Sequence, residues 1–124
     1  MEEYKLWIKK ARDDLRWTKH NIEAKEFAGA CFSAQQAAET ALKAFIVLHN
    51  KRLEKIHDVE ALLESCVNID SKFRTLRKPA KILFPYYVET RYPFGDELVS
   101  FDKPKANEAY LAASKIVKFV EEKI

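Results

Sequence analysis

Three polar side chains recur along one side of an otherwise small and apolar stretch, residues 32–46. Gln36, Glu39 and Lys43 stand at positions i, i+3 and i+7, which share one stripe if the stretch is helical. Glutamine both donates and accepts hydrogen bonds, and the other two side chains supply opposite charges. This stripe either lines a ligand cleft or holds a simple Glu39–Lys43 ion pair, worth roughly 0.2–0.5 kcal/mol on a helix surface.

A second candidate for binding chemistry is the segment Thr-Arg-Tyr-Pro at residues 90–93. The guanidinium of Arg91 offers a planar fork of donors that fits phosphate or carboxylate oxygens. Tyr92 and its aromatic neighbours supply rings that stack on a base or on the guanidinium. The competing interpretation is an ordered loop whose arginine pairs with a carboxylate and whose aromatic rings close one end of the fold.

The third candidate is the pair His57-Asp58. Histidine exchanges a proton near neutral pH, so His57 has the chemistry of a general acid or base. Asp58 precedes a segment with helical apolar periodicity, which favours a helix N-cap over a partner for His57. His20 and His49 are far from any cluster of carboxylates, so neither indicates a metal site.

Helical periodicity predicts the elements that position these residues. The first helix is expected over residues 2–25 and the second over about 26–49, with the polar stripe on the second. A short helix is expected from the Asp58 cap to about Cys66. A further helix, capped by Asp70 or Ser71, should be interrupted at Pro79 and end near Pro85, and the last helix should begin near Pro104 and run to the end of the chain.

Residues 86–104 form the longest stretch expected to be a loop, and this loop contains residues 90–93. Loops of this length in compact domains are uncommon and often functional. No alternating strand pattern, internal repeat or low-complexity segment is found. The predicted fold is therefore all-α, an up-and-down four-helix bundle with an additional short helix, in a single domain over residues 1–124.

The overall composition narrows the class of protein. With 124 residues and 48% hydrophobic content, the chain is long and apolar enough to bury a core. No apolar run approaches the length of a membrane span, and no signal peptide is recognised, so we expect a cytoplasmic protein with no membrane partner. The sequence has no glycine-rich phosphate loop, catalytic serine motif or zinc pattern, so neither a cofactor nor a metal is expected.

The net charge is only +3, but the positive charge is concentrated in residues 72–91. This segment has six basic residues and one acidic residue, Glu89. The excess would attract a phosphate or a polyanion such as RNA. A solvated helix face is the alternative explanation, because most runs of charge serve that role.

Taken together, these motifs resemble those of the HEPN domain family. The resemblance is to the small stand-alone prokaryotic members that carry a Thr-Arg-Tyr-Pro motif. The resemblance covers almost the whole chain. It rests on these segments: Trp7…Ala11…Asp14-Leu15; Phe32-x-x-Gln35-Gln36-Ala37-Ala38-Glu39-x-x-Leu42-Lys43-Ala44; His57-Asp58-Val-x-x-Leu62-Leu63; and Thr90-Arg91-Tyr92-Pro93.

The resemblance implies an all-α bundle, usually a homodimer, that works beside a separate minimal nucleotidyltransferase or within a toxin–antitoxin pair. It implies a nucleotide-binding cleft, with Arg91 and Lys43 on phosphate and Tyr92 stacking or hydrogen-bonding. The residues that the resemblance assigns to this cleft are Gln36, Glu39, Lys43, His57, Arg91 and Tyr92.

A second branch of the family consists of ribonucleases with an Arg-x4–6-His signature late in the chain. No histidine follows Arg91 here. The spacing occurs once, at Arg52-Leu-Glu-Lys-Ile-His57, in a connection between helices, and we interpret this match as coincidental. No catalytic residue is therefore assigned.

Three hypotheses remain open at this stage. The leading one is a non-catalytic homodimeric subunit that binds a nucleotide or nucleotide-bearing substrate and partners a nucleotidyltransferase. The first alternative is a ribonuclease toxin that acts on RNA through His57 with Arg52 or Arg91. The second alternative is a dimeric interaction module in which the polar stripe only sets the geometry of the dimer.

Overall fold

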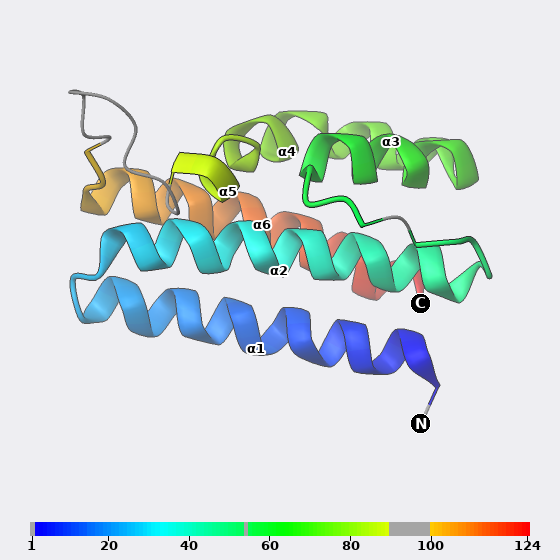
Figure 1. Ribbon diagram of the computed structural model, residues 1–124, viewed down its shortest axis with the longest axis horizontal. Helices are drawn as coiled ribbons and strands as arrows, with labels where there is room; N and C mark the ends of the chain where they lie inside the picture. Colours follow the sequence, from blue (N-terminus) through cyan, green and yellow to red (C-terminus); the bar gives the residue numbers. More distant parts are fainter. Residues whose placement is uncertain (1, 54, 90–99) are drawn as a thin grey trace.

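Three long helices dominate the computed structural model of this chain, and the predicted all-α fold is confirmed (Figure 1). The structure describes residues 2–53, 55–89 and 100–124. The long helices are α1 (Glu3–Glu23), α2 (Phe27–Leu48) and α6 (Lys103–Lys123). Their bounds agree with the sequence-based expectation to within a few residues.

Four shorter helical segments join α2 to the region before α6. They are α3 (Val59–Ile69), the 3-10 helix η1 (Ser71–Leu76), α4 (Arg77–Leu83) and α5 (Tyr86–Glu89). In Figure 1, α1 runs from right to left, and α2 and α6 run from left to right. In chain order between α2 and α6, the segment of η1, α4 and α5 returns from right to left above them. These four passes form the up-and-down bundle, and α3 is the additional short helix.

Aspartate side chains cap backbone N–H groups at the starts of α3, η1 and α6. Asp58 Oδ1 accepts hydrogen bonds from the backbone N–H groups of Glu60 at 2.9 Å and Ala61 at 3.1 Å, as expected of an N-cap. Asp70 accepts from the next 3-10 segment, and Asp102 accepts from the start of α6. The expected caps at Asp58 and Asp70 are confirmed, whereas the cap at Asp102 was not predicted.

Helix α2 lies at the centre of the bundle and packs against both α1 and α6. Six of its fifteen buried residues are alanine, whose small side chain lets neighbouring helices approach closely. An aromatic cluster fills the end of the core near the C-terminus of α2, where the ring centroids of Phe45 and Phe73 are 4.4 Å apart and those of Phe73 and Phe119 are 4.9 Å apart. The buried alanines of α2 are Ala30, Ala34, Ala37, Ala38, Ala41 and Ala44.

Two sequence expectations need correction in this part of the chain. Pro79 does not interrupt a helix, because η1 gives way to α4 at Arg77 and the proline occupies the first turn of α4, where no intrahelical donor is required. The expected loop starts too early, because Tyr86–Glu89 forms the helical turn α5 and the Tyr86 side chain is buried. Burial of an aromatic ring stabilised a helical turn that periodicity alone did not indicate.

No helix in the described ranges is long and apolar enough to cross a membrane. Residues 90–93, which carry the Thr-Arg-Tyr-Pro motif, lie outside the residues that the structure describes.

Candidate functional site

The Glu39 carboxylate is the centre of a polar cluster between α2 and the segment that precedes α3. Lys43 Nζ donates to Glu39 Oε2 at 3.1 Å, and Gln35 Nε2 donates to Glu39 Oε1 at 3.2 Å. His57 Nδ1 lies 3.3 Å from both carboxylate oxygens. Three side chains from two segments therefore converge on one buried carboxylate.

The Glu39–Lys43 ion pair is buried. Only 4% of Glu39 and 7% of Lys43 is exposed, so this is an internal ion pair rather than the surface pair that the spacing alone allows. Taking both charges out of water is costly, and close contact with extra hydrogen bonds is what compensates for that cost. The cluster meets this condition, because Gln35 and His57 occupy the remaining positions around Glu39.

His57 joins this buried cluster to the protein surface. Its side chain is 49% exposed, although Nδ1 faces the buried Glu39. The imidazole is also stacked on the ring of Tyr87 in α5, with centroids 4.7 Å apart and planes inclined by 5°. Because Nδ1 faces Glu39, Nε2 is the ring nitrogen that remains for a contact from outside the cluster.

Helix α1 closes the other side of the cluster through Trp7. Lys43 Nζ lies 5.7 Å from the centroid of the Trp7 ring, within the range of a cation–π interaction. Lys43 is therefore held between a carboxylate and an aromatic face, and most of its donors point into the protein. This arrangement positions Lys43 firmly, but leaves His57 as the group that meets solvent.

Gln35 is a member of the cluster that the sequence analysis did not single out. Its side chain is fully buried, and Nε2 donates to the backbone carbonyl of His57 at 3.1 Å as well as to Glu39. Gln36 Nε2 in turn donates to Gln35 Oε1 at 2.8 Å. Gln35 thus fastens the His57 segment to α2, and its position four residues before Glu39 was the available signal.

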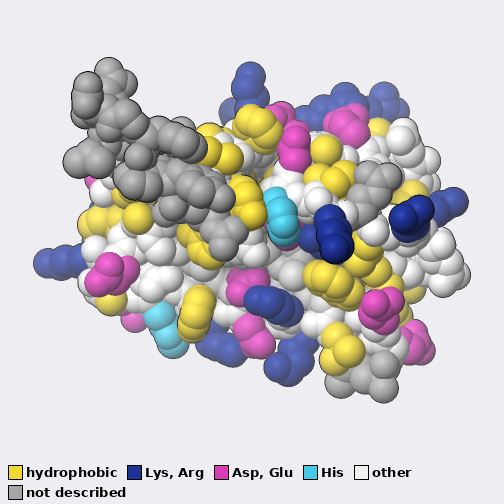
Figure 2. Space-filling model, viewed as in Figure 1, with side chains coloured by type: hydrophobic (Ala, Val, Ile, Leu, Met, Phe, Trp, Pro, Cys, Tyr) yellow, Lys and Arg dark blue, Asp and Glu magenta, His cyan; other side chains and the backbone are white. Residues whose placement is uncertain are grey.

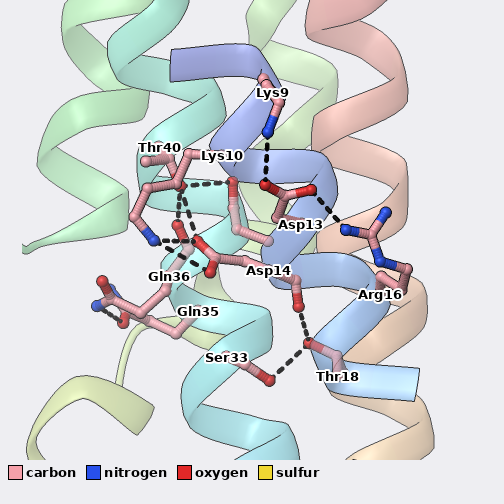
Figure 3. Close-up of polar contacts among 11 residues, drawn as sticks. Lys9, Lys10, Asp13, Asp14, Arg16, Thr18, Ser33, Gln35, Gln36 and Thr40 are labelled. Carbon is pink, nitrogen blue, oxygen red and sulfur yellow. Dashed lines mark hydrogen bonds and ion pairs between the residues drawn. The ribbon is translucent and has the colours of Figure 1, made fainter. Parts of the chain in front are cut away.

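A second polar cluster lies between α1 and α2 (Figure 3). Asp14 accepts from Lys10 Nζ at 3.2 Å and from Thr40 Oγ1 at 3.4 Å, and Thr40 also donates to the backbone carbonyl of Gln36. One turn away, the hydroxyls of Thr18 and Ser33 are 2.7 Å apart (Figure 3). Burial raises the pKa of the Asp14 carboxyl because its desolvation outweighs the attraction of Lys10.

The structure brings together four of the six expected site residues. Glu39, Lys43 and His57 are in direct contact, and Gln36 reaches them through Gln35. The other two, Arg91 and Tyr92, lie outside the described residues.

Arg52, the alternative partner for His57, lines a different cavity. That cavity, of about 290 Å³, lies between the end of α2 and α3, and Ile46 and Leu62 form part of its wall. Within the described residues, no group of three or more histidine, cysteine, aspartate or glutamate side chains is placed to hold a metal ion.

The chain belongs to the HEPN domain family. The family's sequence model matches residues 4–123, which is nearly the full length and includes every residue of the Glu39 cluster. The resemblance on which the sequence analysis relied is thereby confirmed.

Solved structures agree with this assignment. The crystal structure of the Thermus thermophilus protein TT1696 is 34% identical, with a TM-score of 0.85 and coverage of 100% of both chains. An archaeal HEPN homologue is 25% identical, with a TM-score of 0.79 over 99% of this chain and 98% of the other. A HEPN domain protein from Thermotoga maritima is 28% identical, with a TM-score of 0.77 over 94% of each chain. Among curated proteins, no match was found.

Proposed function

We propose that this HEPN protein is a homodimeric, non-catalytic subunit that binds a nucleotide or nucleotide-bearing substrate. In this proposal it works in the cytoplasm beside a separate minimal nucleotidyltransferase, within a toxin–antitoxin pair or a two-component enzyme. The observation that supports the proposal is the half-exposed imidazole of His57, oriented by buried Glu39 and stacked on Tyr87.

This arrangement offers two kinds of contact to a nucleotide. The imidazolium form of His57 donates from both ring nitrogens, from Nδ1 to Glu39 and from the outward nitrogen to a phosphate oxygen. The stacked aromatic rings form a platform beside which a base can lie. Lys43 contributes less to phosphate affinity than the sequence implies, because Glu39 already balances its charge. The main phosphate contact is therefore assigned to Arg91 and the base contact to Tyr92.

Position in the sequence is the reason for this assignment. Arg91 and Tyr92 follow Tyr87, the ring that stacks on His57, by only four and five residues.

Calorimetric titration with ATP tests the proposal. We expect binding by the unmodified protein and at least about tenfold weaker binding by Arg91→Ala and by His57→Ala, because each loses a charge-assisted or hydrogen-bonded contact. Arg12→Ala and His20→Ala are matched controls, since both side chains are exposed and neither belongs to the Glu39 cluster or to the basic segment 72–91. Unchanged affinity of Arg91→Ala, or equal loss in the controls, would show that the site is wrong.

A ribonuclease is the second candidate, and the contact between His57 Nδ1 and Glu39 favours it. A carboxylate that orients a histidine is a common arrangement for general acid–base catalysis, which cleavage of RNA requires. Incubation of the purified protein with total RNA would reveal such activity. Cleavage abolished by His57→Ala would support it, and cleavage that survives this change would eliminate His57 as the catalytic group.

A further inference from the structure

Helix α1 carries a stripe of four solvent-facing residues, Leu6, Lys10, Asp13 and Trp17, hereafter the α1 stripe. They follow one another at i, i+4, i+7 and i+11, so they share one side of the helix. Leu6 is 52% exposed and Trp17 is 67% exposed, both high values for large apolar side chains. Figure 2 shows hydrophobic side chains toward both ends of α1, with lysine and acidic side chains between them.

We propose that the α1 stripe is the surface through which two copies of this chain pair, with their α1 helices antiparallel. A two-fold axis between residues 11 and 12 would set Leu6 against the partner's Trp17 and Lys10 against the partner's Asp13. The same axis generates both contacts a second time, with the roles of the chains exchanged. The inference rests on the homodimer of the proposed function and names its surface.

Self-complementarity is the reason for choosing a second copy as the occupant. In a two-fold interface the same patch must fit itself, so each apolar or charged group needs its complement at the mirrored position. The α1 stripe has this property about one centre, because apolar residues face each other at its ends and opposite charges face each other in its middle. Binding to an unrelated protein would not require the residues of α1 to be complementary to one another about a single centre.

Shape supports the same pairing. Trp17 borders an open hollow of about 450 Å³ on the surface of α1, which has room for the partner's Leu6. The 21 residues of α1 extend for about 30 Å, which gives room for all four contacts. The lining residues of the hollow are Lys10, Asp13, Asp14, Arg16, Trp17 and His20.

Apolar and charged contacts have different roles in such an interface. Buried tryptophan side chains commonly dominate the affinity of interfaces, so the two Trp17–Leu6 contacts would supply most of it. Lys10 already pairs with Asp14 at 3.2 Å, and Asp13 already pairs with Arg16 at 2.7 Å and with Lys9 at 3.3 Å. The charges of the α1 stripe would therefore fix the register of the two helices and add little to the affinity. Since Lys10 also reaches the Asp14–Thr40 cluster, pairing would bring the partner's α1 to the edge of α2.

Molar mass measured by light scattering during gel filtration tests the surface. We expect a dimer for the unmodified protein and a monomer for Trp17→Glu, whose dimer dissociation constant should rise by roughly 100-fold or more, because two contacts are lost per dimer. Leu111→Glu is the matched control, since Leu111 is also 67% exposed and also lies on a long helix. Circular dichroism checks that both variants keep their helices.

Only one pattern supports the α1 stripe: a dimeric parent, a monomeric Trp17→Glu and a dimeric Leu111→Glu. A monomeric parent, a dimeric Trp17→Glu or a monomeric Leu111→Glu would overturn it. ATP titration on the same samples separates this result from the proposed function, because Trp17 is outside the Glu39 cluster. A dimer that uses the α1 stripe but binds no nucleotide would reject the function while keeping the surface.

Disulfide cross-linking tests the antiparallel direction. A mixture of Leu6→Cys and Trp17→Cys should give a cross-linked dimer on mild oxidation, whereas each variant alone should not. In a dimer of one variant the two introduced cysteines are too far apart, because position 6 of one chain and position 6 of its partner would be about 16 Å apart along the helix. The native cysteines, Cys31 and Cys66, are buried and should not interfere. Cross-linking of the single variants would indicate parallel pairing and contradict the proposal.

Discussion

Glu39 Oε2 lies 3.1 Å from Lys43 Nζ, and both side chains are almost completely enclosed by α1, α2 and the segment before α3. Because neither charge is well hydrated, each depends on the other, and removing one leaves its partner buried without compensation. The intact pair therefore adds little to the free energy of unfolding, whereas removing one member lowers that free energy strongly.

Glu39→Ala should lower the free energy of unfolding by about 3–5 kcal/mol, as expected when a buried ion pair loses one member. Urea denaturation followed by circular dichroism measures this change. Lys9→Ala is a matched control, because Lys9 and Asp13 form an exposed pair with the same i, i+4 spacing, and it should leave the stability almost unchanged. Equal effects of the two substitutions would show that burial of the Glu39–Lys43 pair is not important for stability.

Asp58→Ala should destabilise the protein by about 1 kcal/mol, since two N–H groups at the start of α3 lose their acceptor. Asp58→Asn should recover most of that loss, because its amide oxygen accepts the same hydrogen bonds. Chemical denaturation of the three proteins measures the differences. If Asp58→Asn were as unstable as Asp58→Ala, the effect would arise from charge rather than from capping.

Asp14 should make stability depend on pH. Burial raises the pKa of Asp14, so folding favours its protonated form. The stability that this form contributes is fully present below the unfolded-state pKa and is lost as pH rises through the folded-state pKa. Asp14→Asn, which resembles the protonated form, should therefore raise the melting temperature at pH 7 by a few degrees. The difference should vanish near pH 3, and thermal scans across this range would measure it. A variant less stable than the parent at pH 7 would show that Lys10 and Thr40 outweigh desolvation.

The Cys66 thiol should be inert in the folded protein. Burial raises the pKa of Cys66 to about 12, and its Sγ lies 3.6 Å from the Leu42 carbonyl oxygen, so almost no thiolate exists at pH 8. In a Cys31→Ala background, Ellman's reagent at pH 8 should react only after denaturant is added. Rapid labelling under native conditions would mean that α3 opens readily from α2.

Much of the fold follows from sequence because its signals are local. The apolar spacing of α1 and α2 and the aspartates before α3 and η1 each act within one or two helical turns, so the sequence predicts them directly. The helical turn α5 escaped prediction because Tyr86 is held by packing against distant residues such as Phe101, whose ring centroid is 6.3 Å away. Periodicity contains no information on contacts of that kind.

The site was harder to predict than the fold. Glu39 and Lys43 could be found from their spacing, but the same spacing fits a surface pair, and only tertiary packing shows that they are buried. Gln35 was not predicted because its neighbour Gln36 already fits the i, i+3, i+7 spacing with Glu39 and Lys43. Asp14 was not expected inside, because it stands among the charged residues of α1, and its burial depends on the hydroxyl that Thr40 supplies from another helix.

The alanine-rich face of α2 has a consequence for how this sequence can vary. Each of these alanines is 0% exposed, so a larger side chain there would strain the packing of α2 against its neighbours, at a cost of about 1–3 kcal/mol. In a library of random substitutions selected for folding, the α2 alanines should stay fixed, while exposed positions such as Leu111 on α6 vary freely. The α2 alanines, which carry no chemistry of their own, would then be among the positions that change least between related sequences.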